Sequence, residues 1–557
     1  GLRLKGQMAI VKGETSGEIY KSPFSAEFLK TTYNSESRVQ EYLPIAERGY
    51  LSMTDGASFS YDGNVTLNYN TLVNEKHIIY AGAGLEVTQN DNNSHGFIMT
   101  GFPDDRYSDP AFAIQYKKET KPSSSESKSR AIGFFANGNY SYDDRYFADV
   151  SVRIDGSSKF GADKKYAPFW SAGAGWNVHN EKFFKHTKIS MLKLRYSYGV
   201  TGNQEFSAYQ AKTMFQFNTD RLYNSGISAA LMGYGNPDLE WQNQYQSNYG
   251  FDFGYAKDRI RLQFNYYQKK TEGMLTSVSV APSLGLPSNT FTSNLGKIQN
   301  KGVEVNLNAV LIRDQGKDFE WSVMLQAAHN KNKIMEISTA LKNINEKNNQ
   351  DKTTPAAVYE EGESMSAIKA VPSLGIDPTT GQELFMKKDG TITYTWDATD
   401  KVICGDSEPK VFGNVGTNLY WKGWNLNMVF KYDLGADYYN STLAERVEGA
   451  NPRYNADRRV LNNRWKEPGQ HALYKNIKEY TTTYISSRFV QKENTLQLTS
   501  LSLSYDLNRE WIRKFGLNTM RLSFYMNDVF RASTVKNERG LDYPFQRSFV
   551  FGLNIGF

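Results

Sequence analysis

The sequence has little of what marks several common classes of protein. Cys404 is the single cysteine among 557 residues, so neither an intrachain disulfide nor a cysteine-rich metal site can form. No uncharged apolar run of about 18 residues occurs, which excludes a helical membrane protein. The six histidines are not at metal-ligand spacing, and the G-x-S-x-G, H-E-x-x-H and P-loop motifs are missing. We therefore expect no metal, no cofactor and no catalytic site.

Charge and composition exclude two further classes. Lys and Arg number 65 against 59 Asp and Glu, and the net charge of +6 comes without a basic run, which argues against a nucleic-acid-binding protein. Aromatic residues make up 14% of the chain and prolines number only 16, a composition too aromatic and too β-prone for a disordered chain. A membrane β-barrel stays open, because its strands show only alternating hydrophobicity.

What the sequence does have is strict alternation of apolar and polar residues in many short segments. This period of two is typical of strands with one apolar face, and helical periodicity is scarce by comparison. The apolar positions of the clearest segments are Phe549, Phe551, Leu553, Ile555 and Phe557; Met520, Leu522, Phe524 and Met526; Trp424, Leu426, Met428, Phe430 and Tyr432; Val303, Val305, Leu307 and Ala309; and Leu192, Leu194, Tyr196 and Tyr198.

The breaks between these segments alternate in length along the chain. Short breaks lie near residues 72–76, 142–145, 183–189, 256–259, 313–318, 421–424 and 508–517. Long ones lie near residues 12–56, 91–128, 155–166, 200–240, 271–297, 333–410, 433–494 and 529–545. Transmembrane barrels have short turns on the periplasmic side and long loops outside, so the pattern predicts an all-β transmembrane antiparallel barrel with about 16 strands. A soluble all-β protein with half-buried strands is the alternative.

Polar and aromatic residues fall where such a barrel would need them. Charged side chains occupy positions predicted to face a wet lumen, namely Lys193, Arg195, Glu304, Lys431 and Arg521. Aromatic residues cluster at the short turns, where a girdle at the membrane interface is expected: Tyr140, Tyr142, Tyr146, Tyr420, Trp421 and Trp424. The acidic stretch at residues 91–93 is interpreted as a solvated loop tip.

Several segments resemble a known family, and they occur in the family's order along nearly the whole chain. They are Arg195-Tyr196-Ser197-Tyr198-Gly199-Val200-Thr201-Gly202-Asn203-Gln204, Asn236-Pro237-Asp238-Leu239-Glu240-Trp241, residues 294–304 (NLGKIQNKGVE), Gly405-Asp406-Ser407-Glu408-Pro409-Lys410, Arg464-Trp465, and residues 543–557. Together they resemble the barrel of SusC/RagA-type TonB-dependent transporters of Bacteroidetes outer membranes.

The resemblance implies a barrel of about 22 strands, a plug inside it and a TonB box ahead of the plug. We expect residues 1–557 to form the C-terminal part of that barrel domain, with the plug and the first strands outside this chain. Family resemblance also assigns Phe557, the terminal aromatic of the last strand, to the signal read by the outer-membrane assembly machinery. Its alternative role is simply to face lipid.

The long breaks carry aromatic residues that could bind substrate. Flat apolar ring faces stack on sugar rings or extended peptides, while neighbouring amides and carboxylates bind the polar groups. The alternative is that the rings pack the loops against each other or against a partner. The predicted substrate-binding residues are Tyr209, Tyr223, Tyr234, Tyr394, Trp396, Tyr438, Tyr439 and Trp465.

By resemblance, the expected function is import of nutrient oligomers across the outer membrane. Oligosaccharides are the first choice of substrate and peptides the second. The implied partners are a SusD-like surface lipoprotein that closes over the loops and the TonB-ExbB-ExbD complex acting through the plug. Three alternatives stay open: a passive porin, a surface adhesin without transport, and an outer-membrane enzyme such as a barrel lipase.

Overall fold

A computed structural model gives the fold. It describes residues 1–557 except 34–37, 162–163, 185–187, 204–207, 210, 225, 237, 280–289, 295, 338–341, 343–344, 347, 350, 354, 356–357, 452–455, 479–481 and 537–544; side chains are also not described at 31–33, 38–40, 218–223, 275–279, 290–293 and 509. Five residues quoted for the family resemblance, Gln204, Pro237, Leu295, Tyr543 and Pro544, therefore lie outside the described residues.

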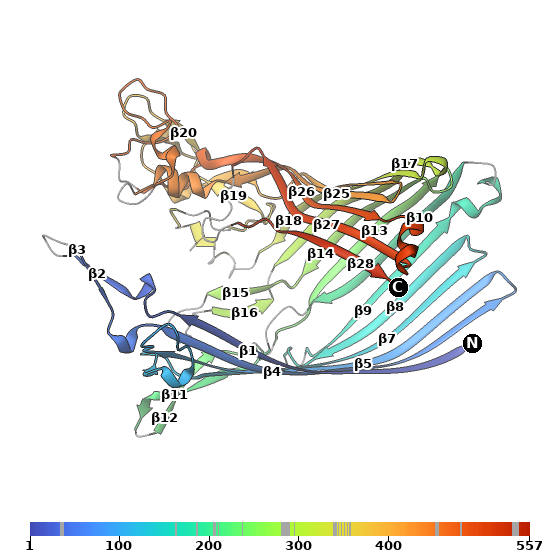
Figure 1. Cartoon of the computed structure of the whole chain (residues 1–557), viewed down its shortest axis with the longest axis horizontal. Coiled ribbons are helices and arrows are strands. Elements are labelled where there is room, and N and C mark those ends of the chain that lie inside the picture. The colour runs from blue at the N-terminus through green and yellow to red at the C-terminus, as the bar shows by residue number, and fades with distance from the viewer. Residues whose placement is uncertain are drawn as a thin grey trace.

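One large antiparallel sheet dominates the described part of the chain (Figure 1). It has 17 strands, including the two-residue strand β6 (Gln115–Tyr116) at the end of β5. The long strands pair in chain order: β1 (Leu2–Lys21), β4 (Tyr50–Val73), β5 (His77–Thr100), β7 (Ser123–Tyr142), β8 (Tyr146–Ser157), β9 (Tyr166–Asn177), β10 (Ile189–Asn203), β13 (Gln242–Tyr255), β14 (Ile260–Glu272), β17 (Lys297–Asp314), β18 (Phe319–Glu336), β24 (Val411–Trp421), β25 (Trp424–Tyr439), β26 (Val490–Asp506), β27 (Thr519–Ser533) and β28 (Phe549–Gly556).

The connections hold the remaining elements, all of them short. Small sheets form from β2 (Leu29–Tyr33) with β3 (Arg38–Tyr42), β11 (Met214–Tyr223) with β12 (Gly226–Gly233), β15 (Leu275–Ser279) with β16 (Thr290–Asn294), β19 (Ala367–Ala370) with β23 (Val402–Asp406), and β20 (Ser373–Ile376) with β21 (Glu383–Met386) and β22 (Ile392–Thr393). The helical turns are η1 (Ala26–Phe28), η2 (Ile45–Glu47), η3 (Pro110–Phe112), η4 (Val178–Asn180), η5 (Lys182–Phe184), η7 (Gln315–Lys317), η8 (Ala398–Asp400), η9 (Thr442–Glu448), η10 (Arg458–Leu461), η11 (Ser487–Phe489), α2 (Arg509–Ile512) and η12 (Arg513–Phe515). No helix among the described residues is long and apolar enough to cross a membrane.

Each face of the sheet has its own chemistry, because side chains alternate between the faces along every strand. A cross-strand row on one face consists of Val65, Leu85, Phe134 and Ile154. The next row, on the opposite face, consists of Asn64, Glu86, Gly133 and Asp155. The sheet therefore has an apolar face and a polar face. About half of the Phe134 side chain is exposed although it lies in mid-strand, as expected for a wall that contacts lipid.

The two ends of the sheet differ as the sequence predicts. Most connections at one end are turns of two to four residues, apart from the β9–β10 and β26–β27 connections, which contain helical turns, and the longest connections leave from the other end, on the left of Figure 1. The turn between β24 and β25 has two residues, Lys422 and Gly423, both with positive φ (46° and 89°), as a tight hairpin requires. On the apolar face beside these turns, the Trp424 and Tyr505 rings pack at 4.6 Å and Tyr146 stacks on Trp176. Such rings suit a membrane interface.

Several strands are longer than the sequence predicts. The expected long breaks at 12–56 and 91–128 shrink to residues 22–49 and 101–122, because β1, β4, β5 and β7 continue into them. The interpretation of residues 91–93 as a loop tip is wrong, since Asp91 pairs with Lys128 across β5 and β7, with Nζ–Oδ2 at 2.6 Å. Residues 91–96 of β5 and 123–128 of β7 are polar on both faces, so these parts lack the alternation that marks the rest of the strands.

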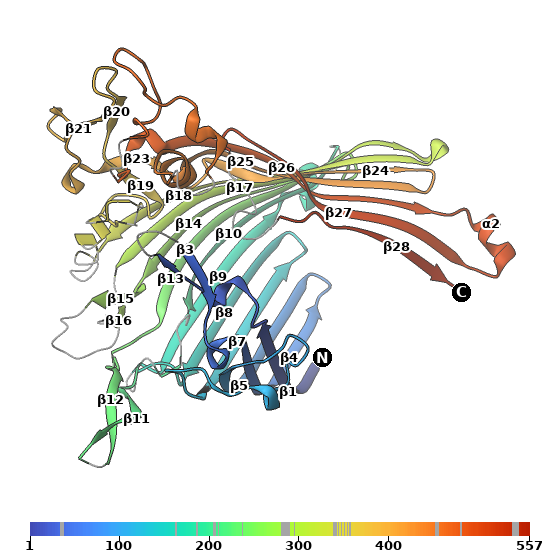
Figure 2. The same cartoon turned by 60° about the vertical axis from the view of Figure 1, so that its left-hand side comes forward.

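Buried clusters lie at the long-loop end. One, between β1, β4 and β5, contains Leu51, Met99 and Phe102. Another contains Phe160, Phe169 and Trp241, whose Phe160 and Trp241 rings stack at 4.3 Å. At the sides of the sheet, β1 pairs with β4 alone and β28 with β27 alone among the described residues. Figure 2 shows the sheet as a curved wall with the loops gathered at one end.

Candidate functional site

Two long connections at the loop end fold against each other. They join β18 to β24 (residues 337–410) and β25 to β26 (residues 440–489), and we call their described residues the loop assembly (Figure 2). Main-chain hydrogen bonds join the two connections: Val371 donates to the carbonyl of Ile485 at 3.4 Å, and Ser487 donates to that of Val371 at 2.9 Å. The loop assembly is therefore a folded unit above the sheet.

Its base is apolar. Ala444 and Val447 of η9 pack with Tyr474 and Phe489, and all four side chains are buried. Tyr439, at the end of β25, packs against the same cluster, with its ring 6.1 Å from that of Phe489. The cluster fixes η9 to the strands that carry it.

A buried charge cluster joins the two connections above that base. Arg488 donates from Nη2 to Oε2 of Glu383 at 2.8 Å and from Nη1 to Oε2 of Glu448 at 2.5 Å. Glu383 and Glu448 expose only 3% and 1% of their side chains, and Lys475 Nζ lies 3.8 Å from Glu448. Burial disfavours the charged guanidinium, but the hydrogen bonds and charges of the two glutamates outweigh it and raise the pKa of Arg488.

Arg464 stabilises the end of η9. Its guanidinium is buried and donates to four carbonyl oxygens, those of Val460, Lys475, Val447 and Glu448. The last two are at the C-terminal end of η9, where main-chain carbonyls have no partner within the helix. Burial lowers the pKa of Arg464, and the charge of Glu448 opposes that effect. Sequence reasoning named Arg464 only as part of a family motif.

Three of the predicted aromatic residues lie in the loop assembly. Trp396 donates from Nε1 to the carbonyl of Ile485 at 2.9 Å, and its ring stacks on Tyr484. Trp465 donates from Nε1 to the carbonyl of Pro378 at 2.8 Å. Tyr394 donates its hydroxyl proton to Oδ2 of Asp377 at 2.5 Å and lowers the pKa of that carboxyl, but its ring stays 48% exposed. The polar atoms of all three thus bind neighbouring loop residues.

Two more predicted residues, Tyr438 and Tyr439, are strand residues and not loop residues. They end β25 and pair with Gln491 and Val490 of β26, because β25 continues past the predicted break at 433. The hydroxyl of Tyr439 is buried without a hydrogen-bond partner among the described residues.

The other three predicted residues lie elsewhere. Tyr209 accepts a hydrogen bond from the Lys128 main chain at 3.0 Å, and Tyr223 lies in β11, with its side chain outside the described set. Tyr234 follows β12 and is 44% exposed. The β11–β12 hairpin and the loop assembly lie on opposite sides in both views, so the eight residues do not form one cluster (Figures 1 and 2).

The loop assembly also contains an open polar pocket of about 520 Å³, lined among others by Glu346, Asn349, Lys369 and Lys401. Lys369 pairs with Glu360 and Glu363 at 2.7 Å each, while Lys401 donates to the carbonyls of Asn349 and Asp351. Burial lowers the pKa of Lys401. These residues are far apart in sequence and share no motif, so no signal in the sequence could have grouped them.

The polar face of the sheet carries paired charges. Arg153 binds Glu86 at 2.8 Å beside a recess of about 270 Å³ that Trp241 also lines. Arg195, predicted to face the lumen, donates from Nη2 to Asp252 at 2.8 Å. No group of three or more His, Cys, Asp or Glu that could hold a metal occurs in the part of the chain that the structure describes. Phe557 follows β28 and is 87% exposed.

Known proteins share both sequence and fold with this chain. TonB-dependent receptor P3 of Formosa agariphila is 28% identical over 78% of this chain and 46% of its own length, and TonB-dependent receptor SusC of Bacteroides thetaiotaomicron is 23% identical over 90% and 51%. The chain thus spans about half the length of the curated relatives it matches.

Solved structures agree in fold. The RagAB peptide transporter superposes with a TM-score of 0.82 at 22% identity, covering 96% of this chain and 57% of that one. The RagAB peptide importer in its closed-closed state superposes with a TM-score of 0.83 at 22% identity, covering 100% of this chain and 60% of that one. The predicted SusC/RagA-type resemblance is confirmed. Residues 17–527 match the family described as TonB dependent receptor-like, beta-barrel, and the chain belongs to that family.

Proposed function

We propose that this chain forms the outer wall and substrate-receiving loops of an outer-membrane importer of nutrient oligomers, energised by TonB. Membership of the family implies an outer-membrane location and a receptor or transporter rather than an enzyme. The observation that carries the proposal is the combination of a one-sided apolar sheet with a folded loop assembly at one end. A passive pore needs the one-sided apolar sheet but not the folded loop assembly.

The same proposal completes the barrel. We propose that β1 and β28 pair with further strands of a barrel of about 22, which also holds a plug and a TonB box. Unpaired main-chain groups at either edge would be costly in lipid, which favours a closed barrel. Matches over only 46 to 53% of the lengths of three curated relatives support a longer whole.

A SusD-like lipoprotein is the proposed partner of the loop assembly. The four most exposed large apolar side chains there are Leu374, Ile392, Leu461 and Leu473, between 54% and 70%. Several exposed apolar side chains on one folded loop unit fit a protein interface. Leu461→Glu with Leu473→Glu should then release the lipoprotein from the purified complex, while Leu434→Glu, on β25 and outside the assembly, should not.

Aromatic rings in the loops are the proposed substrate contacts, with oligosaccharides as first choice and peptides as second. Tyr234 and Tyr394 support this best, because nearly half of each residue is exposed and an exposed tyrosine ring can stack on a ligand. The remaining predicted residues, Tyr209, Tyr223, Trp396, Tyr438, Tyr439 and Trp465, are proposed to shape the loops around them. Phe557 is proposed as the assembly signal.

Uptake by a deletion strain tests the proposal. The strain is supplied with a panel of oligosaccharides and peptides, with and without a plasmid copy of the complete gene. An importer restores growth on one class of oligomer, and loses it when the TonB system is deleted. Uptake that persists without TonB would instead identify a passive porin, and unchanged growth of the deletion strain would favour an adhesin.

A further inference from the structure

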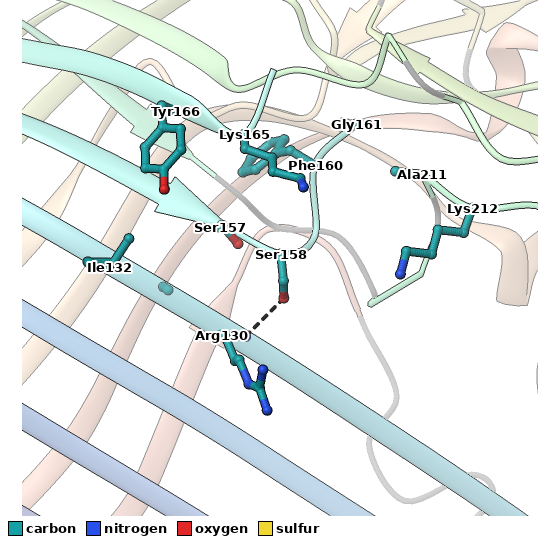
Figure 3. Close-up of a pocket in the computed structure, with 12 residues that line it drawn as sticks. Arg130, Ile132, Ser157, Ser158, Phe160, Gly161, Lys165, Tyr166, Ala211 and Lys212 are labelled. Carbon is teal, nitrogen blue, oxygen red and sulfur yellow. Dashed lines mark hydrogen bonds between the residues drawn. The ribbon is translucent and has the colours of Figure 1, made fainter. Parts of the chain in front are cut away.

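A pocket of about 400 Å³ lies at the loop end of β7, β8 and β9 (Figure 3). Its floor is on the apolar face of the sheet. Ile132, Gly156 and Tyr166 form one cross-strand row, two residues along from the row of Phe134 and Ile154, so all of them face the same side. These residues place the floor of the pocket on the lipid-facing side of the wall, just beyond the apolar band, while Ala131 and Ser157 line it from the row on the other face.

Three cationic side chains line this pocket: Arg130 on β7, Lys165 before β9, and Lys212 in the connection after β10. None of the lining residues is acidic. Among the described residues, no carboxylate forms an ion pair with Lys165 or Lys212, whereas the adjacent Lys164 pairs with Glu240 at 3.4 Å. Cations that have no acidic partner among the described residues of the pocket favour an anionic ligand.

Arg130 is held in a fixed position. Its Nε donates to Oε1 of the buried Gln89 at 2.8 Å, and its main-chain N–H donates to Oγ of Ser158 at 2.9 Å, the dashed line in Figure 3. The two terminal guanidinium nitrogens make no hydrogen bond within the described part of the chain. A planar guanidinium held in this way can bind two oxygens of a phosphate, and the Ser158 hydroxyl can donate to a third.

We propose that this pocket binds a phosphate group. The inference rests on the membrane orientation of the proposed function but not on import. Two sources share the chemistry, the phosphorylated headgroup of an outer-leaflet glycolipid and free phosphate. Tyr166 is 63% exposed between the apolar band and the cations, the place of an aromatic side chain at a headgroup boundary.

Native mass spectrometry of the full-length protein in detergent tests the site. The probes are lipid A with its phosphate groups, the same lipid after dephosphorylation, and inorganic phosphate. The variant Lys165→Gln/Lys212→Gln removes two cations, and Lys164→Gln is the matched control outside the pocket. We expect the double variant to bind the phosphorylated probe about tenfold more weakly, because each substitution removes an ammonium group and its charge-assisted hydrogen bond to the phosphate. The Lys164→Gln variant should bind the probe like the wild type.

The probes separate the sources. The ligand is the lipid headgroup if the double variant loses tenfold in affinity for phosphorylated lipid A and the wild type binds inorganic phosphate only weakly. The ligand is free phosphate if the wild type binds inorganic phosphate as tightly as lipid A and the double variant loses the same factor with both. The proposal is overturned if the dephosphorylated lipid binds equally well, or if the double variant binds like the wild type. A circular dichroism spectrum and heat-modifiable gel mobility confirm that each variant is folded, and uptake assays report on import separately.

Discussion

Arg488 and Glu383, which are 105 residues apart in the sequence, form a bidentate ion pair between the two connections of the loop assembly, with Nε–Oε1 at 3.1 Å and Nη2–Oε2 at 2.8 Å. Both side chains are buried, and the fork of the guanidinium matches the carboxylate geometry. The pair fixes the position of η11 relative to β21. Its removal should therefore weaken the contact between the two halves of the loop assembly, which main-chain hydrogen bonds also join.

Glu383→Ala should loosen the loop assembly without unfolding the sheet. Removing one partner leaves the Arg488 charge buried with Glu448 alone, which costs about 3 kcal/mol in the free energy of local unfolding. Hydrogen exchange of residues 440–489 measures that cost. Glu320→Ala is the matched control, because its pair with Arg313 at 2.7 Å is exposed at the short turns and should cost less than about 1 kcal/mol. Equal exchange in both variants would contradict a structural role for Glu383.

Arg464→Lys should unfold the last turn of η9. Lysine keeps the charge but cannot reach four carbonyls, so buried acceptors at the end of the helix lose their donors, at a cost of about 2 kcal/mol. Hydrogen exchange at residues 442–448 reports the loss. Arg458→Lys, at an exposed position in η10, is the control and should leave the exchange of η9 unchanged. Protection of η9 in Arg464→Lys would show that the cap is dispensable.

The sheet was predictable from the sequence wherever a membrane imposes one apolar face. Val303, Val305 and Leu307 alternate with Glu304 and Asn306 because lipid and lumen demand different side chains, and β17 carries all of them. Where the strands extend beyond the membrane, neither face has to be apolar. β5 continues through Asp91, where neither face is apolar, so period-two reasoning stopped too early although the main-chain pairing did not.

The loop assembly could be predicted much less well. Its contacts join residues such as Glu383 and Arg488, whose meeting depends on how two long connections fold and leaves no periodic trace. Aromatic content did direct attention to segments that fold into the loop assembly, those of Tyr394, Trp396 and Trp465. Aromatic content could not show that the indole N–H of Trp396 donates to the carbonyl of Ile485, because the sequence does not distinguish an exposed tryptophan from a packed one.

Tyr394→Phe should alter how the loop assembly responds to acid. The hydrogen bond from Tyr394 lowers the pKa of Asp377 below its ordinary 3.8, so the ionised carboxylate stabilises the loop. That contribution is fully present above about pH 4 and is lost as the pH falls through the lowered folded pKa. The phenylalanine variant should therefore be less protected from protease than the wild type near neutral pH, and the difference should vanish at the acid end. Asp389→Asn, whose carboxylate binds only its own turn, is the comparison. A difference that grows on acidification would refute the assignment.

Val152→Arg and Ser151→Arg test which face of the sheet contacts lipid. The two residues are neighbours on β8, and Val152 belongs to the row of Ala136 and Trp170, while Ser151 belongs to that of Asn137 and Ser171. An arginine in place of Val152 would put its charge in hydrocarbon at a cost of about 2–4 kcal/mol, whereas one in place of Ser151 would face the same side as Arg153. Urea unfolding of the protein in lipid vesicles should show the larger loss for Val152→Arg. If Ser151→Arg were the more destabilised variant, the apolar face would have to be the inner one.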